Sequence, residues 1–369
     1  MICNRISLTD FRNIESANIE LCDSVNIFYG NNAQGKTNAV EGVNIFSRGK
    51  SFRGSDEKDL IRFGSEGFRI GIEYENKDGL SSLEYAVFGK ERQRKKNGYK
   101  INKISEMMGS FRSVIFFPDN LRIIKDGPDE RRNFINAAIS QCFPEYIKYY
   151  SDFKNALENR NCILKFASKG FFIDENEITS WSYSMAEYAS FIYVYRRDYI
   201  ERIKKHAKEI MKEISDGKEE LDISYISDIE DSPGKSREKI KEEYIEIMKR
   251  DLEREKSAGV SLFGPHRENI EIKINGVSAR SYSSQGQIRS AVLSLKLAEG
   301  EVIKELFGEY PVFLFDDVLS ELDEKRRKYI FEGVKDRQVI ITACDEDKND
   351  IKADKIINVS GGYYVSSRG

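Results

Sequence analysis

The stretch SVNIFYGNNAQGKTN, residues 24–38, decides the fold of this chain of 369 residues. The apolar run SVNIFY predicts a buried strand, and a helical pattern begins near Lys36. Between them, Gly30 and Gly35 allow tight backbone turns, so that successive N–H groups can converge on phosphate oxygens. The stretch matches the pattern G-x-x-x-x-G-K-[ST] with a strand before it and a helix after it. It therefore predicts an α/β domain with a cradle for nucleotide phosphates.

The side chains of this cradle have separate predicted roles. Lys36 is expected to reach the β- and γ-phosphates, and the Thr37 hydroxyl is expected to bind Mg²⁺. The predicted cofactors are ATP and Mg²⁺. The nucleotide-binding residues predicted from this loop are Gly30, Asn31, Asn32, Ala33, Gln34, Gly35, Lys36, Thr37 and Asn38. The alternative explanation is a chance match in a loop rich in glycine and asparagine.

A second apolar strand, in YPVFLFDDVLSELD at residues 310–323, ends in two aspartates. Acidic side chains at the carboxyl end of a buried parallel strand face the ligand site of an α/β sheet. We expect Asp316 to hold the Mg²⁺ with Thr37, and Asp317 to orient and deprotonate the attacking water. Phosphoryl transfer depends on positioning and charge stabilisation, so no nucleophilic side chain is required. Lys36 and Asp317 are therefore the predicted catalytic residues of an ATP hydrolase.

The segment ARSYSSQGQIRSAVLSLKLAE, residues 279–299, predicts a second phosphate-binding element. Small polar residues and Gly286 precede a long helical pattern, and a helix start exposes N–H groups that attract anions. Because the cradle already holds the triphosphate, a second copy of the chain could supply this helix start. Two antiparallel copies would then enclose two ATP molecules with twofold symmetry. The alternative is a polar helix cap that has no ligand.

Composition limits the class of protein. The chain is 33% charged and 40% hydrophobic with a formal net charge of −3, so any binding to DNA must come from local basic patches. The five cysteines, at positions 3, 22, 142, 162 and 344, show no Cys-x-x-Cys pair and favour a reducing compartment. No apolar window reaches about 18 residues, and the first residues do not read as a signal peptide. The expected location is the cytoplasm, without a membrane partner.

The order of patterns along the chain predicts an insertion into one α/β domain. Strand patterns fill the first 120 residues, and the Asn97-Gly98 pair predicts a type I′ hairpin. Residues from about 130 to 254 read mainly as helix, after which strands and helices alternate again. We therefore expect a head formed by residues 1–125 and 255–369, with a mixed sheet plus antiparallel strands, and a helical arm formed by residues 126–254.

Within the expected arm, apolar residues recur at alternating spacings of four and three. They are Trp181, Met185, Tyr188, Ile192, Tyr195 and Tyr199. Such a seam is typical of helices that pack in a bundle or of a coiled coil. The bundle is favoured because the run is too short for a long rod.

In this order, the motifs resemble those of the ABC-type P-loop ATPase heads used in chromosome maintenance, and within that group the RecF family of bacterial recombination and gap repair. The resemblance covers nearly the whole chain. It is carried by LTDFRNIESANIEL (8–21), GNNAQGKTN (30–38), FFPDNLRIIKDGPDERRNFIN (116–136), GPHRENIEIKING (264–276), SSQGQIRSAVLSLKLAE (283–299) and FLFDDVLSELDEKRR (313–327).

The resemblance assigns further roles. Lys36 and Thr37 match the Walker A motif, Asp316 matches Walker B, and Arg12 resembles an arginine that reaches nucleotide phosphates. Thr342 stands near the switch histidine of transporters. The signature, acting in trans, corresponds to Ser283, Ser284, Gln285, Gly286 and Gln287, and the D-loop at the dimer interface corresponds to Ser320, Glu321, Leu322 and Asp323. The chain departs from the family pattern at Ala33, where glycine is usual, and at Ile288, where a second glutamine is common.

What the resemblance implies about activity is specific. It implies a weak DNA-dependent ATPase that dimerises with ATP and binds double-stranded DNA near single-strand gaps. With RecR and RecO as partners, such a protein promotes RecA loading in DNA repair, the SOS response and replication restart. The resemblance also implies association with the nucleoid. Slow hydrolysis is consistent with Asp317 in place of the longer glutamate of transporter relatives.

One basic segment outside the ATPase motifs is a candidate for DNA binding. The segment GKERQRKKNGYKINK, residues 89–103, has seven Lys or Arg among fifteen residues, and Arg92, Arg94, Lys95 and Lys96 are its predicted DNA contacts. A solvated hairpin face is the alternative. His266 is expected to be structural, because phosphoryl transfer here needs no histidine.

Two other functions use the same head chemistry: an SMC-like structural head and the ATPase subunit of a transporter. The long helical insertion and Thr342 disfavour the transporter. The distance along the chain from Thr37 to Ser283 is too short for the long coiled coil of an SMC protein.

Overall fold

The computed structural model describes residues 1–230, 234–318, 322–332, 336–344 and 353–367. Its central sheet has six strands in the order β15, β14, β3, β13, β12, β8. Their bounds are β15 (Tyr363–Ser367), β14 (Lys355–Ser360), β3 (Val25–Tyr29), β13 (Val339–Ala343), β12 (Val312–Phe315) and β8 (Ser113–Phe116). All neighbours in this sheet pair in parallel except β14 and β15. Every residue of β3, β12, β13 and β8 is buried, as expected for parallel strands covered on both faces.

An antiparallel sheet of six strands lies against one face of the central sheet. Its order is β2 (Ile14–Glu20), β1 (Ile2–Phe11), β4 (Gly67–Asn76), β5 (Gly79–Phe88), β6 (Glu91–Lys96) and β7 (Tyr99–Lys100). Between the sheets lies helix α1 (Lys36–Arg48), whose Val40 and Val43 share one hydrophobic core with Leu8 and Leu314. The predicted hairpin turn is confirmed, because Asn97 and Gly98 have φ values of 51° and 78°.

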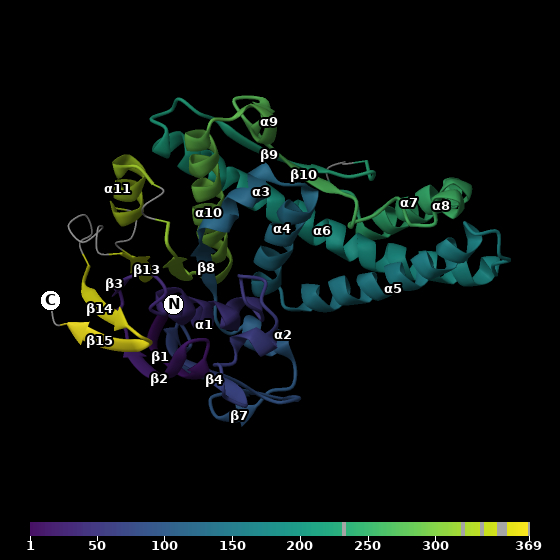
Figure 1. The fold of residues 1–369 in the computed structure, drawn as a ribbon. Helices are drawn as coiled ribbons and strands as arrows, with labels where there is room; N and C mark the ends of the chain where they lie inside the picture. The colour runs from purple at the N-terminus through teal and green to yellow at the C-terminus, as the bar shows by residue number, and fades with distance from the viewer. Residues whose placement is uncertain (231–233, 319–321, 333–335, 345–352, 368–369) are drawn as a thin grey trace.

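Helices cover the other face of the central sheet (Figure 1). The helices whose buried residues form the core on this side are α3 (Arg122–Lys125), α4 (Pro128–Cys142), α5 (Glu145–Ala167), α6 (Glu175–Ile214), α7 (Arg237–Arg250), α9 (Ala279–Tyr282) and α10 (Gln285–Phe307). Helix α8 (Leu252–Ala258) packs on α5 away from the sheet. The shorter helix α2 (Ile104–Met108) packs on α1, and α11 (Glu324–Glu332) contacts α6. Two 3₁₀ turns cover Glu57–Leu60 and Pro118–Leu121.

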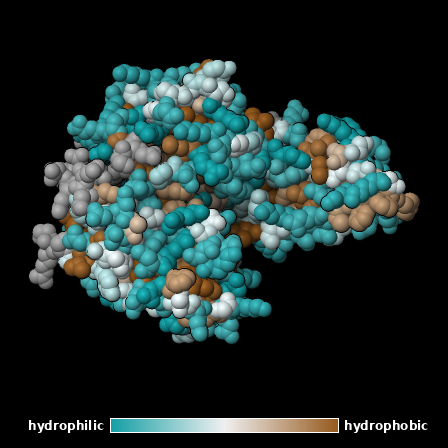
Figure 2. Space-filling model, viewed as in Figure 1, coloured by the Kyte–Doolittle hydropathy of each residue, from teal (hydrophilic) through white to brown (hydrophobic). Residues whose placement is uncertain are grey.

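The predicted apolar seam lies on α6, which packs against α5, α7 and α10. Met185, Ile192 and Tyr199 are buried, while the other three seam residues are partly buried against the same core. The prediction of a packed bundle is therefore confirmed. The parts of α5 and α6 far from the sheets project with α7 and α8 as an arm (Figure 1). Hydrophobic surface gathers at the free end of this arm (Figure 2), where Phe166, Phe171 and Phe172 are exposed.

One strand inside the predicted helical region was not foreseen. Strand β9 (Leu221–Ile226) pairs with β10 (Asn269–Ile274), and β11 (Val277–Ser278) completes a sheet of three strands. The expected boundary between arm and head lies between residues 254 and 255, and this sheet pairs a strand before it with strands after it. The division into arm and head stays a prediction. Among the described helices, none is both long enough and apolar enough to cross a bilayer.

Candidate nucleotide-binding site

The loop of residues 30–35 connects the buried strand β3 to α1, in the arrangement that the sequence predicts. Gly30 has φ 155°, and a Cβ placed there would lie 2.2 Å from the carbonyl oxygen of Val359 in β14, so only glycine fits. Gly35 has φ 116° directly before the helix. Ala33 occupies the left-handed region with φ 63°, which costs an L-residue about 1–2 kcal/mol. Alanine in place of the usual glycine at position 33 therefore preserves the turn, at the cost of a strained backbone at that residue.

Lys36 begins α1, and its ammonium group lies against this loop. Its Nζ donates to the carbonyl oxygen of Gly30 and to that of Asn31 at 3.1 Å, and it lies 3.4 Å from Sγ of Cys344. The side chain is buried. The lysine is thus held at the loop backbone, beside the position at which the sequence predicts the β- and γ-phosphates.

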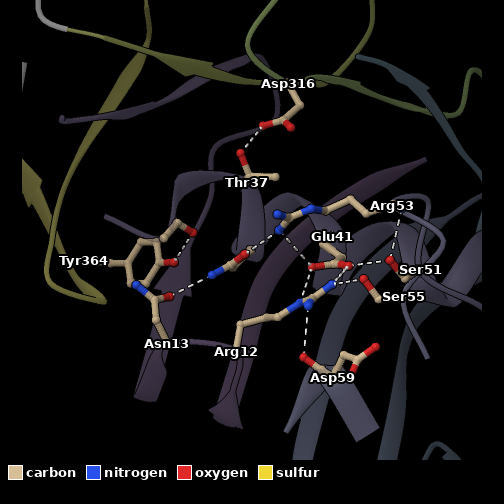
Figure 3. Close-up of polar contacts among 12 residues, drawn as sticks. Arg12, Asn13, Thr37, Glu41, Ser51, Arg53, Ser55, Asp59, Asp316 and Tyr364 are labelled. Carbon is tan, nitrogen blue, oxygen red and sulfur yellow. Dashed lines mark hydrogen bonds and ion pairs between the residues drawn. The ribbon is translucent and has the colours of Figure 1, made fainter. Parts of the chain in front are cut away.

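Two hydroxyl side chains, one from α1 and one from β13, meet at the carboxylate of Asp316. Thr37 donates to its Oδ1 at 2.9 Å (Figure 3). Thr342 near the end of β13 donates to the same oxygen at 3.0 Å. β13 lies between β3 and β12, so the carboxyl ends of the three strands share one edge of the sheet. Burial raises the pKa of Asp316, while the two hydroxyl donors lower it. A carboxylate beside a threonine hydroxyl is an oxygen donor set that suits Mg²⁺, so the predicted metal ligands fit that ion.

Asp317 follows Asp316 and is exposed, with its backbone in the left-handed region at φ 54°. Aspartate tolerates this region better than most residues. Its backbone N–H donates to the hydroxyl of Thr342 at 2.9 Å. The backbone of the predicted catalytic residue Asp317 is thus held by Thr342, and both residues line the same pocket as Lys36.

Arg12 and Glu41 form a polar network beside the cradle that the sequence alone did not indicate (Figure 3). Glu41, in α1, is fully buried and accepts two hydrogen bonds from Arg12, at 2.9 and 2.6 Å. Arg12 also donates to Ser55 at 2.7 Å and to the carbonyl oxygen of Asp59 at 2.9 Å. An arginine that makes four hydrogen bonds is fixed in place, because each would have to break before it could move.

Arg53 is a second arginine of this network, and sequence reasoning missed it. It donates to Oδ1 of Asn38 at 3.1 Å and lies 3.8 Å from Oε2 of Glu41, while close to half of its side chain is exposed. Arg53 is thus less constrained than Arg12. The sequence did carry a signal for Arg53, because it is a basic residue only a few positions after the helix that follows the phosphate-binding loop.

These residues surround an open pocket of about 590 Å³. It is lined by Arg12, Asn13, Asn32, Ala33, Gln34, Gly35, Lys36, Thr37, Asn38, Arg53, Asp59, Ile61, Phe63, Asp317 and Thr342. Tyr364 of β15 supports the loop from outside by donating to the carbonyl oxygen of Gly35 at 2.8 Å. The described lining combines residues 32–38 of the predicted loop with Arg12 and Asp317. It does not include Gly30, Asn31 or Asp316, and it contains no residue from 283–287.

The predicted signature forms the start of α10. Ser284 caps the helix by accepting the N–H of Gln287 at 3.2 Å, and the Gln287 side chain accepts the N–H of Ser284 at 2.8 Å. The polar cap considered as an alternative is therefore present. The cap uses the Ser284 oxygen as an acceptor and leaves its proton available to a ligand. Ser284 and Gln285 are exposed, and the first N–H groups of a helix have no acceptor within it.

Of the predicted D-loop, Ser320 and Glu321 lie outside the described residues. Leu322 is buried, and Asp323 accepts the backbone N–H of Arg326 at 2.9 Å.

Each of the four predicted DNA contacts in the basic hairpin has a partner nearby. Arg92 donates to Glu57 at 2.7 Å, Lys95 pairs with Glu84 at 3.0 Å, and Lys96 donates to Ser110 at 2.9 Å. Arg94 lies over the ring of Tyr85 at 5.1 Å. These contacts are compatible with the solvated hairpin face, and DNA binding by these residues stays a prediction.

His266 makes one hydrogen-bonding contact, between its Nε2 and the carbonyl oxygen of Ser261 at 3.1 Å, and packs near the Phe153 ring. Burial lowers its pKa to about 4. This environment fits the predicted structural role.

Comparison with known proteins identifies close relatives. A family model described as the RecF/RecN/SMC N terminal domain matches residues 2–362. The DNA replication and repair protein RecF of Acetivibrio thermocellus is 37% identical over 351 residues, covering 94% of each chain. The RecF of Thermoanaerobacter sp. is also 37% identical, over 367 residues that cover 99% of each chain.

Solved structures agree with these relatives. The recombination mediator protein RecF-ATP of the RecFOR pathway matches with a TM-score of 0.92 and 34% identity, covering 99% of this chain and 97% of that chain. The Smc head domain from Pyrococcus furiosus matches with a TM-score of 0.58 and 20% identity, covering 100% of this chain and 96% of that chain. The second likeness concerns the fold alone.

Proposed function

The chain belongs to the RecF family of DNA replication and repair proteins, and from this premise we propose that it is an ATP-gated DNA clamp. In this proposal, ATP joins two copies of the chain, and the dimer binds double-stranded DNA near single-strand gaps. With RecR and RecO, the dimer then promotes RecA loading in repair and replication restart. Slow hydrolysis of ATP returns the dimer to separate copies. The protein acts in the cytoplasm, at the nucleoid.

The proposed roles within one copy follow from the pocket. Lys36 binds the β- and γ-phosphates, for which its ammonium group must leave the loop carbonyls that it contacts now. Thr37 and Asp316 hold Mg²⁺, which neutralises phosphate charge when bound. Asp317 orients the attacking water and accepts its proton. Arg53 supplies a second positive charge from the side of the pocket, because it is less constrained than Arg12.

One observation carries the proposal of a dimer. The helix start at Ser284 has exposed N–H groups suited to an anion, but the described lining of the ATP pocket contains no residue from 283–287. A single copy therefore has a phosphate-binding loop in one place and the signature in another. A second copy in a twofold arrangement brings each signature to the other copy's pocket. The family relationship and the likeness to the RecF-ATP structure support this reading.

The DNA-binding part of the proposal is tested by fluorescence anisotropy of a labelled gapped duplex. Protein is titrated with ATP and Mg²⁺ and again without nucleotide, and the Lys36→Met variant serves as the control that lacks the cradle ammonium. The proposal expects binding about tenfold or more tighter with ATP, and no such gain in the variant. Equal affinity in both conditions would show that ATP does not gate the contact with DNA. No binding in either condition would overturn the clamp as an activity of this chain alone.

A further inference from the structure

Arg326 joins two segments that are far apart in the sequence. It lies on α11, and its guanidinium group donates to Ser290 of α10 from Nε at 2.9 Å and from Nη2 at 2.6 Å. Nη2 also donates to the carbonyl oxygen of Gly286 at 2.9 Å, while Nη1 is paired with the carboxylate of Asp323. One side chain thus contacts both the signature and the described end of the predicted D-loop.

The geometry at Gly286 gives this contact a direct effect on Ser284. The carbonyl oxygen that accepts from Arg326 and the N–H that donates to the Ser284 hydroxyl oxygen belong to the same peptide unit, between Gly286 and Gln287. A positive charge at the carbonyl end polarises that N–H. Hydrogen bonds in a chain strengthen one another, so the Ser284 hydroxyl becomes a stronger donor through its own proton.

The arrangement is specific to arginine. Ser290 is buried and Arg326 is mostly buried, so the contacts are shielded from water. A planar guanidinium can donate to Ser290, Gly286 and Asp323 together, whereas a lysine ammonium acts as a single point charge. A Cβ built at Gly286 would meet Nη2 of Arg326 at an ordinary 3.6 Å, so the approach of Arg326 does not itself require glycine at this position.

We propose that Arg326 is a positioning residue that holds the signature and Asp323 as one unit and prepares the Ser284 hydroxyl for a phosphate of the second copy's ATP. This inference rests on the proposed function, since it assumes that the signature acts in trans. In this account Arg326 affects assembly and turnover and leaves unchanged the affinity of each copy's own pocket for ATP.

The test compares Arg326→Gln and Arg326→Lys with a matched control, Lys325→Gln. Lys325 is the neighbouring residue on α11 and pairs with Asp216, away from the signature. For each variant, the affinity for a methylanthraniloyl derivative of ATP, the Tm, the dissociation constant of the ATP-bound dimer, and kcat and KM are measured. We expect Arg326→Gln to weaken the dimer about tenfold or more and to lower kcat, with nucleotide affinity and Tm close to wild type. Arg326→Lys is expected to recover part of the lost dimer affinity and kcat. The control, Lys325→Gln, is expected to match wild type in both.

Two results would overturn the inference. The first is a dimer of wild-type strength and normal kcat in Arg326→Gln. The second is loss of nucleotide binding in both Arg326 variants, which would make Arg326 a support of the whole fold. Ser284→Arg, measured in parallel, separates this inference from the proposed function. If Ser284→Arg dimerises normally, the signature does not act in trans and the proposed function fails. If Ser284→Arg is defective and Arg326→Gln is not, only the inference about Arg326 fails.

Discussion

The hydroxyl oxygen of Thr342 lies 2.9 Å from the backbone nitrogen of Asp317 and accepts its N–H. The same hydroxyl donates to Asp316 at 3.0 Å, so one threonine contacts both acidic residues that the sequence assigns to metal binding and water activation. This contact fixes the left-handed backbone of Asp317, and with it the place from which the Asp317 carboxylate can reach a water molecule.

Replacing Thr342 by valine keeps the shape of the side chain and removes the hydroxyl. The carboxylate of Asp316 then loses a hydrogen-bond donor, and the backbone N–H of Asp317 loses its acceptor. We therefore expect kcat for ATP hydrolysis to fall about tenfold. The affinity for ATP should change little, because Lys36 and the loop are untouched. Steady-state hydrolysis and nucleotide titration measure the two effects. Thr342→Ser retains the hydroxyl and should remain close to wild type; equal loss in both variants would contradict this role.

Asp317→Asn tests the carboxylate itself. The amide keeps the size of the side chain and cannot take a proton from water, so hydrolysis should fall by about 10²-fold or more. ATP binding should persist, and the variant should accumulate as an ATP-bound dimer in light scattering. A variant that remains monomeric in ATP, or hydrolyses it at the normal rate, would remove Asp317 from the mechanism.

The basic hairpin gives a prediction about DNA. Charge reversal at Arg92, Arg94, Lys95 and Lys96 should weaken binding to duplexes of different sequence by a similar factor and reduce the dependence of affinity on salt. Because Glu84 pairs with Lys95, Glu84→Gln should strengthen binding and serves as the control of opposite sign. Unchanged affinity in both proteins would place the DNA contact on another surface.

His266 predicts a pH dependence of stability. Its pKa is lowered to about 4 in the folded protein, below the value of 6.5 expected for an exposed histidine, because burial disfavours the charged ring. The unfolded chain therefore takes up this proton first as the pH falls, and the folded state loses stability between about pH 6.5 and 4. His266→Asn, which retains a donor for the Ser261 carbonyl, should show a smaller loss of unfolding free energy over this interval. The unfolding free energies come from urea titrations at each pH. If they fall equally steeply with pH in wild type and His266→Asn, groups other than His266 dominate the pH dependence.

Local patterns in the sequence predicted the parts of the site that depend on neighbours along the chain. The glycines of the loop, Lys36 and Thr37 lie in one short stretch, and Asp316 ends an apolar strand, so strand order brings them together. The Asn97-Gly98 turn was predicted for the same reason, since its two residues alone favour the conformation.

Contacts between distant residues could not be read in the same way. Arg12 lies in the turn between β1 and β2 and Glu41 lies in α1, so the two meet only after these elements pack. Arg326 likewise reaches Gly286 from another helix. The strand β9 has six residues within a helical region, too few for periodicity to separate strand from helix, and its partner β10 lies well beyond it in sequence. The Ser284 cap shows that the polar helix start serves the fold, and sequence alone could not separate this role from the proposed contact with a ligand.

The most direct test of the account is multi-angle light scattering of the full chain at micromolar concentration, with and without ATP and Mg²⁺, beside Ser284→Arg. The account predicts the mass of two copies for the wild-type protein in ATP and of one copy without it. It predicts one copy for Ser284→Arg in either condition, although that variant still binds ATP. The same mass for the wild-type protein with and without ATP, or a normal ATP-dependent dimer of Ser284→Arg, would contradict the claim that the signature of one copy completes the ATP site of the other.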